Sequence, residues 1–202
     1  MNGVVHGASY QPVVAAGSWV SIFGNNLGPA ARTWNAATEI VNGKLPASLD
    51  GVSVSVDNQP AAVYYISPTQ LNVEVPSNVS GTAQVKVTNA GGSTTASVSV
   101  QPVKPGFFSY PQDNVAAVRS DGAYIGPANL MDGLVTVPAK PGDQVLLFGT
   151  GFGPTVPAIP AGEVVSSPAP LANAVKIHID TVDAVVGFAG LTGAGLYQFN
   201  VT

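Results

Sequence analysis

The sequence predicts an all-β protein made of two tandem antiparallel β-sandwiches, the second of which lacks its last two strands. Three observations lead to this prediction: strand-type alternation, frequent turn residues and an internal repeat. Runs such as VSVSV (52–56) and QVKVT (84–88) place an apolar residue at every second position, as in a strand with one buried face. The 23 Gly and 17 Pro are typical of short strands joined by tight turns.

The internal repeat sets the domain organisation. Three segments of the first half return in the second half in the same order: GSWVSIFGNNLGP (17–29) as GDQVLLFGTGFGP (142–154), VSVSVDNQPAAVYYI (52–66) as VKIHIDTVDAVVGFA (175–189), and QLNV (70–73) as QFNV (198–201). The chain is therefore expected to hold two copies of one module, residues 1–103 and 104–202.

Alternation and turn residues also predict the individual strands. In the first half, seven strands are expected, near residues 4–9, 18–24, 51–57, 61–66, 70–75, 82–88 and 94–101. Seven short strands in about 100 residues match a two-sheet antiparallel sandwich. The best helical candidate, residues 30–41, lies between prolines and predicts at most a short turn. In the second half, the expected elements are a hairpin from 115–119 to 123–125 and strands near 144–149, 174–180, 184–188 and 196–201.

The second copy stops where the first continues through two more strands. The second sandwich is therefore expected to have an open sheet edge and a partly uncovered inner face. The first half, the 115–125 hairpin or another chain could cover this region. Homo-oligomerisation through the edge of the second domain is thus one structural hypothesis.

Composition excludes several classes of partner. The seven basic residues are scattered and the net charge is −4, so a nucleic-acid partner is not expected. No stretch approaches the ~20 apolar residues that span a bilayer, so membrane insertion is not expected. The amino terminus lacks the pattern of a signal peptide. The absence of cysteine excludes disulfides and thiolate metal sites.

A histidine and a carboxylate are the candidate catalytic residues. His178 and Asp180 lie two residues apart on a predicted strand, so their side chains are expected to share a face. A histidine oriented by a carboxylate can act as a base. The alternative, and the commoner situation, is a solvated sheet face.

Hydrolytic catalysis finds little further support. The sequence has no G-x-S-x-G motif, and no spacing joins His6 or His178 to a particular serine. If the protein is an enzyme, the hypothesis that remains is a metal-assisted hydrolase of an ester or lactone, because a bound cation can polarise a carbonyl group.

Calcium is the candidate cofactor. Asp180, Asp183 and Asp121 are candidate metal ligands, because they lie at predicted turns where backbone carbonyls can add further oxygen ligands. None of them has the spacing of a known calcium loop. Aspartates at turns more often serve only to form the turn.

Aromatic residues offer a candidate ligand-binding surface. Tyr64 and Tyr65 are adjacent on a predicted strand, so one ring is expected to point inward and the other outward. The outward ring, placed beside Trp34, could stack on a sugar. Alternatively, these rings cover a seam between the two modules.

Several motifs together resemble a known family. In order, they are GSWVSIFGNNLGP, LPASLDGVSVSVDNQPAAVYYISPTQLNVEVP, PGFF, AKPGDQVLLFGTGFGP and FAGLTGAGLYQFNV. They resemble the Solibacter-type repeat domain near the carboxyl ends of large secreted proteins of soil acidobacteria, which is similar to IPT/TIG immunoglobulin-like modules. The resemblance covers nearly the whole chain. It implies an immunoglobulin-like fold, a secreted or cell-surface location and an accessory role without established chemistry.

The prediction for function is therefore a non-catalytic extracellular or cell-surface module for binding or adhesion. Its candidate partner is a carbohydrate, such as a polysaccharide, or another surface ligand. Two alternatives remain open: a small calcium-dependent hydrolase of an ester or lactone, and a structural module that self-associates through an uncovered sheet edge.

Overall fold

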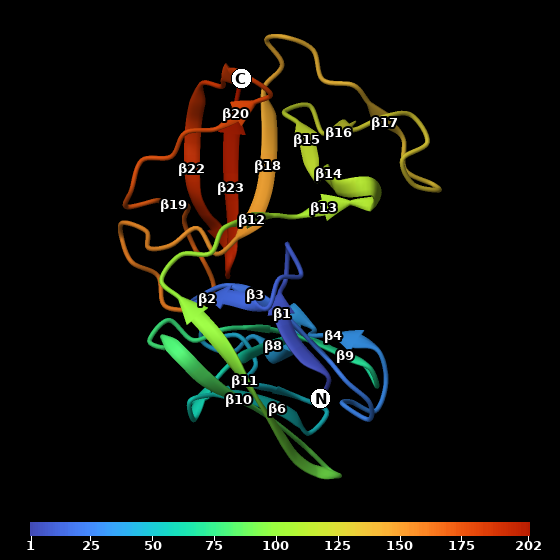
Figure 1. Cartoon of the computed structure of the whole chain (residues 1–202), viewed down its shortest axis with the longest axis vertical. Helices are drawn as coiled ribbons and strands as arrows, with labels where there is room; N and C mark the ends of the chain where they lie inside the picture. Colours follow the sequence, from blue (N-terminus) through green and yellow to red (C-terminus); the bar gives the residue numbers. More distant parts are fainter.

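The computed structural model describes residues 1–202 and confirms the all-β class. The helical elements are only the four-residue α1 (Ala36–Glu39) and the 3₁₀ turn η1 (Pro111–Asp113), so the helix within residues 30–41 is no more than the predicted short turn. None of the helices has the length and apolar character needed to cross a membrane. Figure 1 shows residues 1–103, here called the first half, below residues 104–202, the second half, with the two termini far apart.

The first half contains two sheets. The strands of the first sheet are, in spatial order, β1 (Gly3–His6), β3 (Trp19–Phe23), β9 (Gln70–Glu74), β8 (Ala62–Ile66) and β4 (Arg32–Thr33). The strands of the second are β2 (Val13–Ala15), β11 (Gly92–Gln101), β10 (Gly81–Asn89), β6 (Val52–Val56) and β5 (Ser48–Leu49), with β7 (Gln59–Pro60) also paired to β6. The pairing of β2 with β11 is parallel, and all the others in these sheets are antiparallel.

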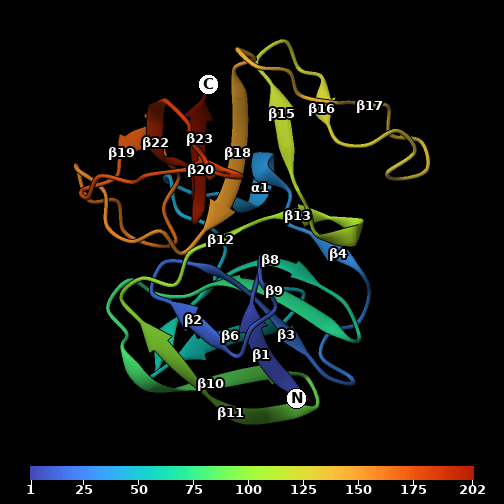
Figure 2. The same cartoon turned by 45° about the horizontal axis from the view of Figure 1, so that its top comes forward.

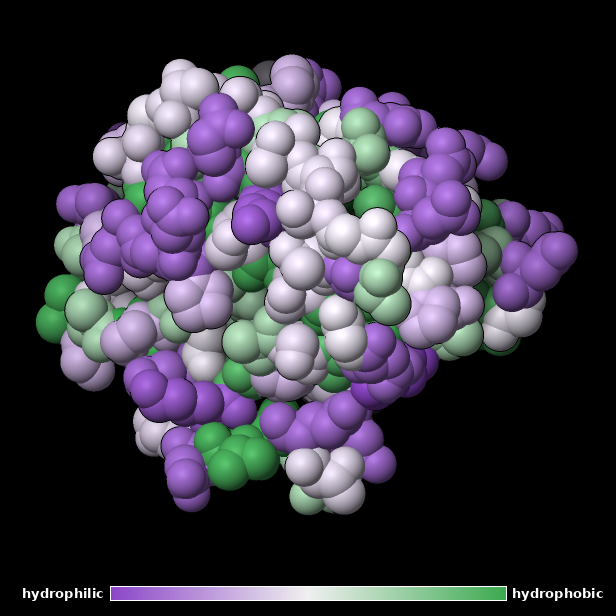
Figure 3. Space-filling view, turned by 90° about the horizontal axis from the view of Figure 1, so that it is seen from below, coloured by the Kyte–Doolittle hydropathy of each residue, from purple (hydrophilic) through white to green (hydrophobic).

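The core of the first half lies between these sheets. It consists of 21 buried residues, and the alternation in β6 shows how the sequence builds it. Val52, Val54 and Val56 are buried, whereas Ser53 and Ser55 between them are partly exposed. Figure 3 looks onto the molecule from below and shows mostly hydrophilic and neutral side chains, with hydrophobic atoms in small separate groups. The apolar faces of the strands therefore point into the sandwich.

All seven strands predicted in the first half are confirmed, with ends that differ by a few residues. The sequence did not reveal β2, β4, β5 and β7, which have two or three residues each. Strands of this length are too short for a periodic pattern, and their pairing depends on a neighbour from elsewhere in the chain.

The second half is built around one eight-stranded sheet. Its main path is β17 (Thr136–Val137), β16 (Tyr124–Ile125), β15 (Ala117–Arg119), β18 (Val145–Thr150), β23 (Leu196–Val201), β22 (Val186–Gly193) and β19 (Ala169–Pro170), with β12 (Gly106–Phe107) paired to β18. Two ribbons lie outside it: β13 (Ser109–Tyr110) with β14 (Asn114–Val115), and β20 (His178–Ile179) with β21 (Val182–Asp183). The predicted 115–125 hairpin is present as β15 and β16, and it extends the sheet beside β18.

Two strand predictions in this half are wrong in extent. The strand expected over 184–188 is the longer β22, Val186–Gly193. Instead of a strand over 174–180, only His178 and Ile179 are paired, in the ribbon with β21. The corresponding residues of the first half, 52–56, form the full strand β6 because β10 pairs along it. The core is correspondingly small, with seven buried residues, and Phe199 is its most buried aromatic ring.

The repeated motifs pair in the same register in both halves. In the first half, β3 and β9 place Phe23 opposite Gln70. In the second half, β18 and β23 place Phe148 opposite Gln198. These four residues occupy corresponding positions of the repeated segments, so each copy of the motif forms the same strand pair.

A side-chain hydrogen bond is repeated as well. Gln70 Nε2 donates to Asn72 Oδ1 over 2.8 Å, and Gln198 Nε2 donates to Asn200 Oδ1 over 2.7 Å. Residues two apart on a strand lie on the same face, which allows the amides to meet. The Gln-x-Asn motif of each copy therefore forms the same local structure.

Candidate binding site at the seam between the two halves

The contact between the two halves, called the seam below, is anchored by Trp19. The Trp19 backbone N–H donates to Thr150 Oγ1 over 2.9 Å, and its indole Nε1 donates to the Ala194 carbonyl over 2.7 Å. Thr150 Oγ1 donates in turn to the Gly195 carbonyl over 2.7 Å. A Cβ atom on Gly195 would lie 2.8 Å from Trp19 Nε1, so only glycine fits here. The tip of the β22–β23 hairpin thus packs directly on the start of β3.

One more segment of the first half, residues 43–45, meets the second half beside Glu163, where Lys44 and Glu163 form an isolated β-bridge. Leu45 N–H donates to the Gly162 carbonyl over 2.9 Å, and Val164 N–H donates to the Gly43 carbonyl over 2.8 Å. In Figure 2 the chain that carries β4 and α1 rises from the first half towards the second. The seam therefore contains backbone hydrogen bonds as well as side-chain contacts.

Three aromatic rings gather at one side of the seam. The ring centroids of Trp34 and Tyr64 are 4.8 Å apart in an edge-to-face arrangement. Trp19 lies 6.0 Å from Trp34 and 5.7 Å from Tyr64. These distances are typical of favourable aromatic pairs. The structure thus brings together two of the three predicted ligand-binding residues and adds Trp19, which the sequence analysis did not select.

These rings line an open cleft of about 310 Å³, called the aromatic cleft below. Phe108 and Leu196 of the second half complete its apolar wall, and Ser21 and Asn72 add polar groups. Asn72 Oδ1 accepts from Ser21 Oγ over 3.2 Å and from Gln70 Nε2 over 2.8 Å. The hydrogen bonds of the Asn72 side chain are those to Oδ1, and its Nδ2 group donates to no protein acceptor.

The predicted arrangement of the two adjacent tyrosines is wrong. Val63 and Ile66 are fully buried, whereas Tyr64 is 39% exposed and Tyr65 is partly exposed. A bulge in the pairing of β8 with β9, between Val63 and Tyr65, interrupts the alternation. Neither tyrosine therefore belongs to the core. Tyr65 instead lies opposite Thr33 of β4 and does not line the aromatic cleft.

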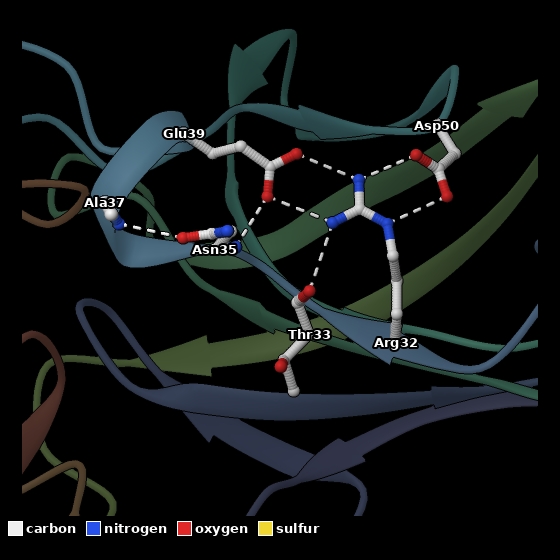
Figure 4. Close-up of polar contacts among 6 residues, drawn as sticks. All are labelled: Arg32, Thr33, Asn35, Ala37, Glu39 and Asp50. Carbon is white, nitrogen blue, oxygen red and sulfur yellow. Dashed lines mark hydrogen bonds and ion pairs between the residues drawn. The ribbon is translucent and has the colours of Figure 1, made fainter.

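Figure 4 shows a charged cluster of Arg32, Glu39 and Asp50. The cluster holds the segment on both sides of Trp34. Arg32 pairs with Glu39 through Nη2–Oε1 and Nη1–Oε2 contacts of 2.9 and 3.0 Å, and with Asp50 through Nη2–Oδ1 and Nε–Oδ2 contacts of 2.6 and 2.8 Å. The hydrogen bonds from Arg32 lower the pKa of both carboxyl groups. Asn35 N–H also donates to Glu39. Trp34 lies between Arg32 and Asn35, so the cluster fixes the chain on both sides of it.

A second cleft, of about 470 Å³, contains a buried carboxyl group and is called the acidic cleft below. Glu74, on β9, is only 3% exposed, and its Oε2 accepts from Gly162 N–H over 2.8 Å across the seam. Burial raises the pKa of Glu74 to about 7. Burial, and then the charge of Glu74, raises the pKa of Tyr197 to about 12. The Tyr197 hydroxyl donates to the Gly153 carbonyl.

The candidate catalytic pair is not arranged as predicted. His178 Nδ1 contacts Asp183 Oδ1 over 2.6 Å, because these two residues lie opposite each other in the β20–β21 ribbon. Asp180 lies in the turn of this ribbon with a left-handed backbone (φ 55°). Both side chains of the His178–Asp183 pair are more than half exposed, and neither residue lines the aromatic or the acidic cleft.

The three candidate calcium ligands lie in two separate places. Asp180 and Asp183 belong to the β20–β21 ribbon, whereas Asp121 follows β15. Asp121 forms an ion pair with Arg119 over 2.7 Å, and hydrogen bonding from Arg119 lowers the pKa of Asp121 to about 2. The structure brings no group of three or more histidine or acidic side chains together as a metal site would need.

His6 is fully buried beside the linker between the halves. Its Nδ1 accepts hydrogen bonds from the backbone N–H groups of Ala8 and Ser9, so this nitrogen is unprotonated. Burial lowers the pKa of His6. A Cβ atom on Gly106 would lie 2.8 Å from the imidazole ring. His6 is therefore packed into the structure and is not accessible to a substrate.

Comparison with known proteins gives one match. Residues 8–102 match the family model of the IPT/TIG domain, which covers most of the first half. The predicted IPT/TIG resemblance is confirmed for this part of the chain, and it indicates an immunoglobulin-like binding module. No curated protein sequence matches the chain, and no solved structure matches it either.

Proposed function

We propose that the protein is a non-catalytic extracellular or cell-surface binding module that binds polysaccharide in the aromatic cleft. The observation that carries this proposal is the grouping of Trp19, Trp34 and Tyr64 around an open, mostly apolar cleft. Tyr64 remains 39% exposed in this group of three aromatic rings. Contiguous apolar patches on a protein surface often mark binding sites.

The chemistry of the cleft fits a sugar better than a purely apolar ligand. Aromatic faces stack on the C–H faces of a pyranose ring, while hydrogen-bonding groups beside them select its hydroxyls. The Nδ2 group of Asn72 is such a group, and the hydrogen bonds from Ser21 and Gln70 to Asn72 Oδ1 fix its orientation. The charged cluster around Arg32 supports the site by holding Trp34 before a ligand arrives, which lowers the entropy cost of binding.

The proposed organisation is a tandem pair of modules, residues 1–103 and 104–202, with the cleft between them. The identical registers of β3–β9 and β18–β23 support two copies of one unit. The motifs shared with the acidobacterial secreted-protein repeat domain support an extracellular setting. Sites at interfaces between domains are common for ligand binding, and both halves contribute residues to this cleft.

Removing one ring of the cleft is expected to weaken glycan binding about fivefold or more. Trp34→Ala and Tyr64→Ala each delete a stacking surface worth about 1 kcal/mol or more, and about 1.4 kcal/mol corresponds to a factor of ten. Affinity electrophoresis in gels that contain β-glucan, xylan or mannan measures the change as a loss of retardation.

The matched control is Tyr124→Ala, because Tyr124 is 43% exposed, similar to Tyr64, but lies on β16 away from the cleft. This variant is expected to bind like the unmodified protein. A reducing-end assay on the same polysaccharides is expected to detect no hydrolysis. Equal retardation of all variants, or release of sugar ends, would contradict the proposed function.

A further inference from the structure

The acidic cleft contains a carboxyl group for which the protein provides no positive partner. Glu74 is the only acidic residue among the 17 that line the cleft, and no lysine, arginine or histidine is among them. Glu74 also takes part in none of the ion pairs of the protein. An ionised carboxyl group that is buried to this degree is costly unless a cation or several donors compensate for it.

One oxygen of this carboxyl group is available to a ligand. Oε2 accepts from Gly162 N–H over 2.8 Å, whereas Oε1 accepts from no protein donor. Two side-chain polar atoms are both unpartnered and sealed from solvent, His6 Nε2 and Ser9 Oγ, and Glu74 Oε1 is not one of them. The unpartnered Oε1 is therefore accessible from the cleft that Glu74 lines.

Further polar groups lie at the rim of the same cleft. Asn78 and Ser80 line it, both are exposed, and their side chains form no hydrogen bond within the protein. Ile159, Leu191 and the ring of Tyr197 add apolar surface. The volume of about 470 Å³ lies within the range of about 300–1,000 Å³ that is typical of small-molecule sites. The cleft thus combines one buried acid, an apolar wall and a polar rim.

We propose that the acidic cleft binds an amino sugar whose amino group is free rather than acetylated. The ammonium group donates to Glu74 Oε1 and supplies the missing positive charge, which makes this hydrogen bond a strong one. The hydroxyl groups of the sugar bond to Asn78 and Ser80 at the rim. The acidic cleft shares no lining residue with the aromatic cleft, so this site is additional to the proposed polysaccharide site.

The set of donors and acceptors favours an ammonium group over a metal ion. A calcium ion takes six to eight oxygen ligands, usually with several carboxylates among them. The cleft has a single carboxyl group, and one of its oxygens is already bonded to Gly162 N–H. An ammonium group has three donors and needs only one carboxylate oxygen beside neutral acceptors.

The test is a titration of the ¹⁵N-labelled full chain with glucosamine at pH 6.5, where the amine of this sugar is protonated. The amides of Asn78, Ser80 and Gly162 are expected to shift and to saturate together. Glucose and N-acetylglucosamine have the same ring without the charge, and they are expected to bind about tenfold or more weakly. In saturating glucosamine, the pKa of Glu74 is expected to fall below its value in the free protein, because a nearby cation favours the ionised form.

Two matched substitutions separate the carboxyl group from charge in general. Glu74→Gln removes the charge but keeps an acceptor for Gly162 N–H, and it is expected to bind glucosamine about tenfold or more weakly. Glu163→Gln removes the same charge from a residue that does not line the cleft, and it is expected to keep the affinity of the unmodified chain. Trp34→Ala, in the aromatic cleft, is also expected to bind glucosamine with unchanged affinity.

Three results would overturn the proposal. The first is no saturable binding of glucosamine, or equal binding of glucosamine and glucose. The second is equal affinity of Glu74→Gln and the unmodified chain. The third is loss of glucosamine binding in Trp34→Ala, because the sugar would then lie in the aromatic cleft. None of these results contradicts polysaccharide binding in the aromatic cleft, and failure of polysaccharide binding there leaves the amino-sugar site intact.

Discussion

Replacement of Phe199 by alanine is expected to unfold most of the second half while the first half stays folded. Phe199 is fully buried, and its ring lies 4.4 Å from Phe152 and 5.3 Å from Phe107 between ring centroids. Truncation of a buried Phe to Ala costs about 3–5 kcal/mol. The core around Phe199 has only seven buried residues, so few other contacts compensate for this loss.

Hydrogen exchange measured along the chain tests this expectation. In Phe199→Ala, amides of β18, β22 and β23 are expected to lose protection, and those of β10 and β11 to keep it. The matched variant is Leu71→Ala, at the corresponding position of the first half. Leu71 is also fully buried, but it belongs to the larger core of 21 buried residues. Loss of protection throughout the chain in Phe199→Ala would show one folding unit rather than the two proposed.

Replacement of Glu74 by glutamine is expected to stabilise the protein at pH 8 by about 3 kcal/mol and to change little at pH 4. Burial raises the pKa of Glu74 from 4.5 to about 7. The folded protein therefore holds a proton that the unfolded chain releases between these two pH values. The contribution of Glu74 to the free energy of unfolding of the unmodified protein falls as pH rises through this window and is constant above it.

Glutamine suits the site because it is neutral at every pH and its carbonyl oxygen can still accept from Gly162 N–H. Denaturant unfolding at pH values from 4 to 8 measures the difference between the two proteins. The curves are expected to converge at low pH and to separate as the pH rises through the window. Parallel curves would show that the ionisation of Glu74 does not contribute to the pH dependence.

Much of the fold follows from local patterns. The alternation in residues 52–56 defines a strand with one buried face, and the structure has that strand as β6. The Gln-x-Asn motif forms the same hydrogen bond in each half because the register is repeated with the sequence. Such features depend on residues near each other in the chain or on the repeat, so a single sequence contains the information.

The arrangement of the aromatic rings was predicted only in part, because the seam depends on distant contacts. Trp34 and Tyr64 were selected correctly as neighbours, but Trp19 was not placed with them. Trp19 is held by Thr150 and Ala194, which lie 131 and 175 residues away in the chain. No local pattern encodes such contacts. One signal was available: Trp19 is a large aromatic residue that is only partly buried, whereas the next three residues of β3 are buried.

Two predictions about side-chain positions were wrong because of a local bulge or turn, which strand alternation does not reveal. The bulge after Val63 places both Tyr64 and Tyr65 outside the core, and strict alternation cannot anticipate an inserted residue. His178 contacts Asp183 rather than Asp180, because the turn closes at Asp180 and sets the two strands of the ribbon opposite each other. In both cases the turn or bulge, and not the period of the strand, decides which side chains meet.

The two indole N–H signals of the protein give the most direct test of the aromatic cleft. The chain contains two tryptophans, Trp19 and Trp34, and both line the cleft. In a titration of the ¹⁵N-labelled chain with a β-glucan oligosaccharide, both indole signals are expected to shift and to saturate together, while backbone amides of β10 and β11 stay in place. Saturable binding that leaves both indole signals unchanged would contradict the assignment of the cleft as the binding site.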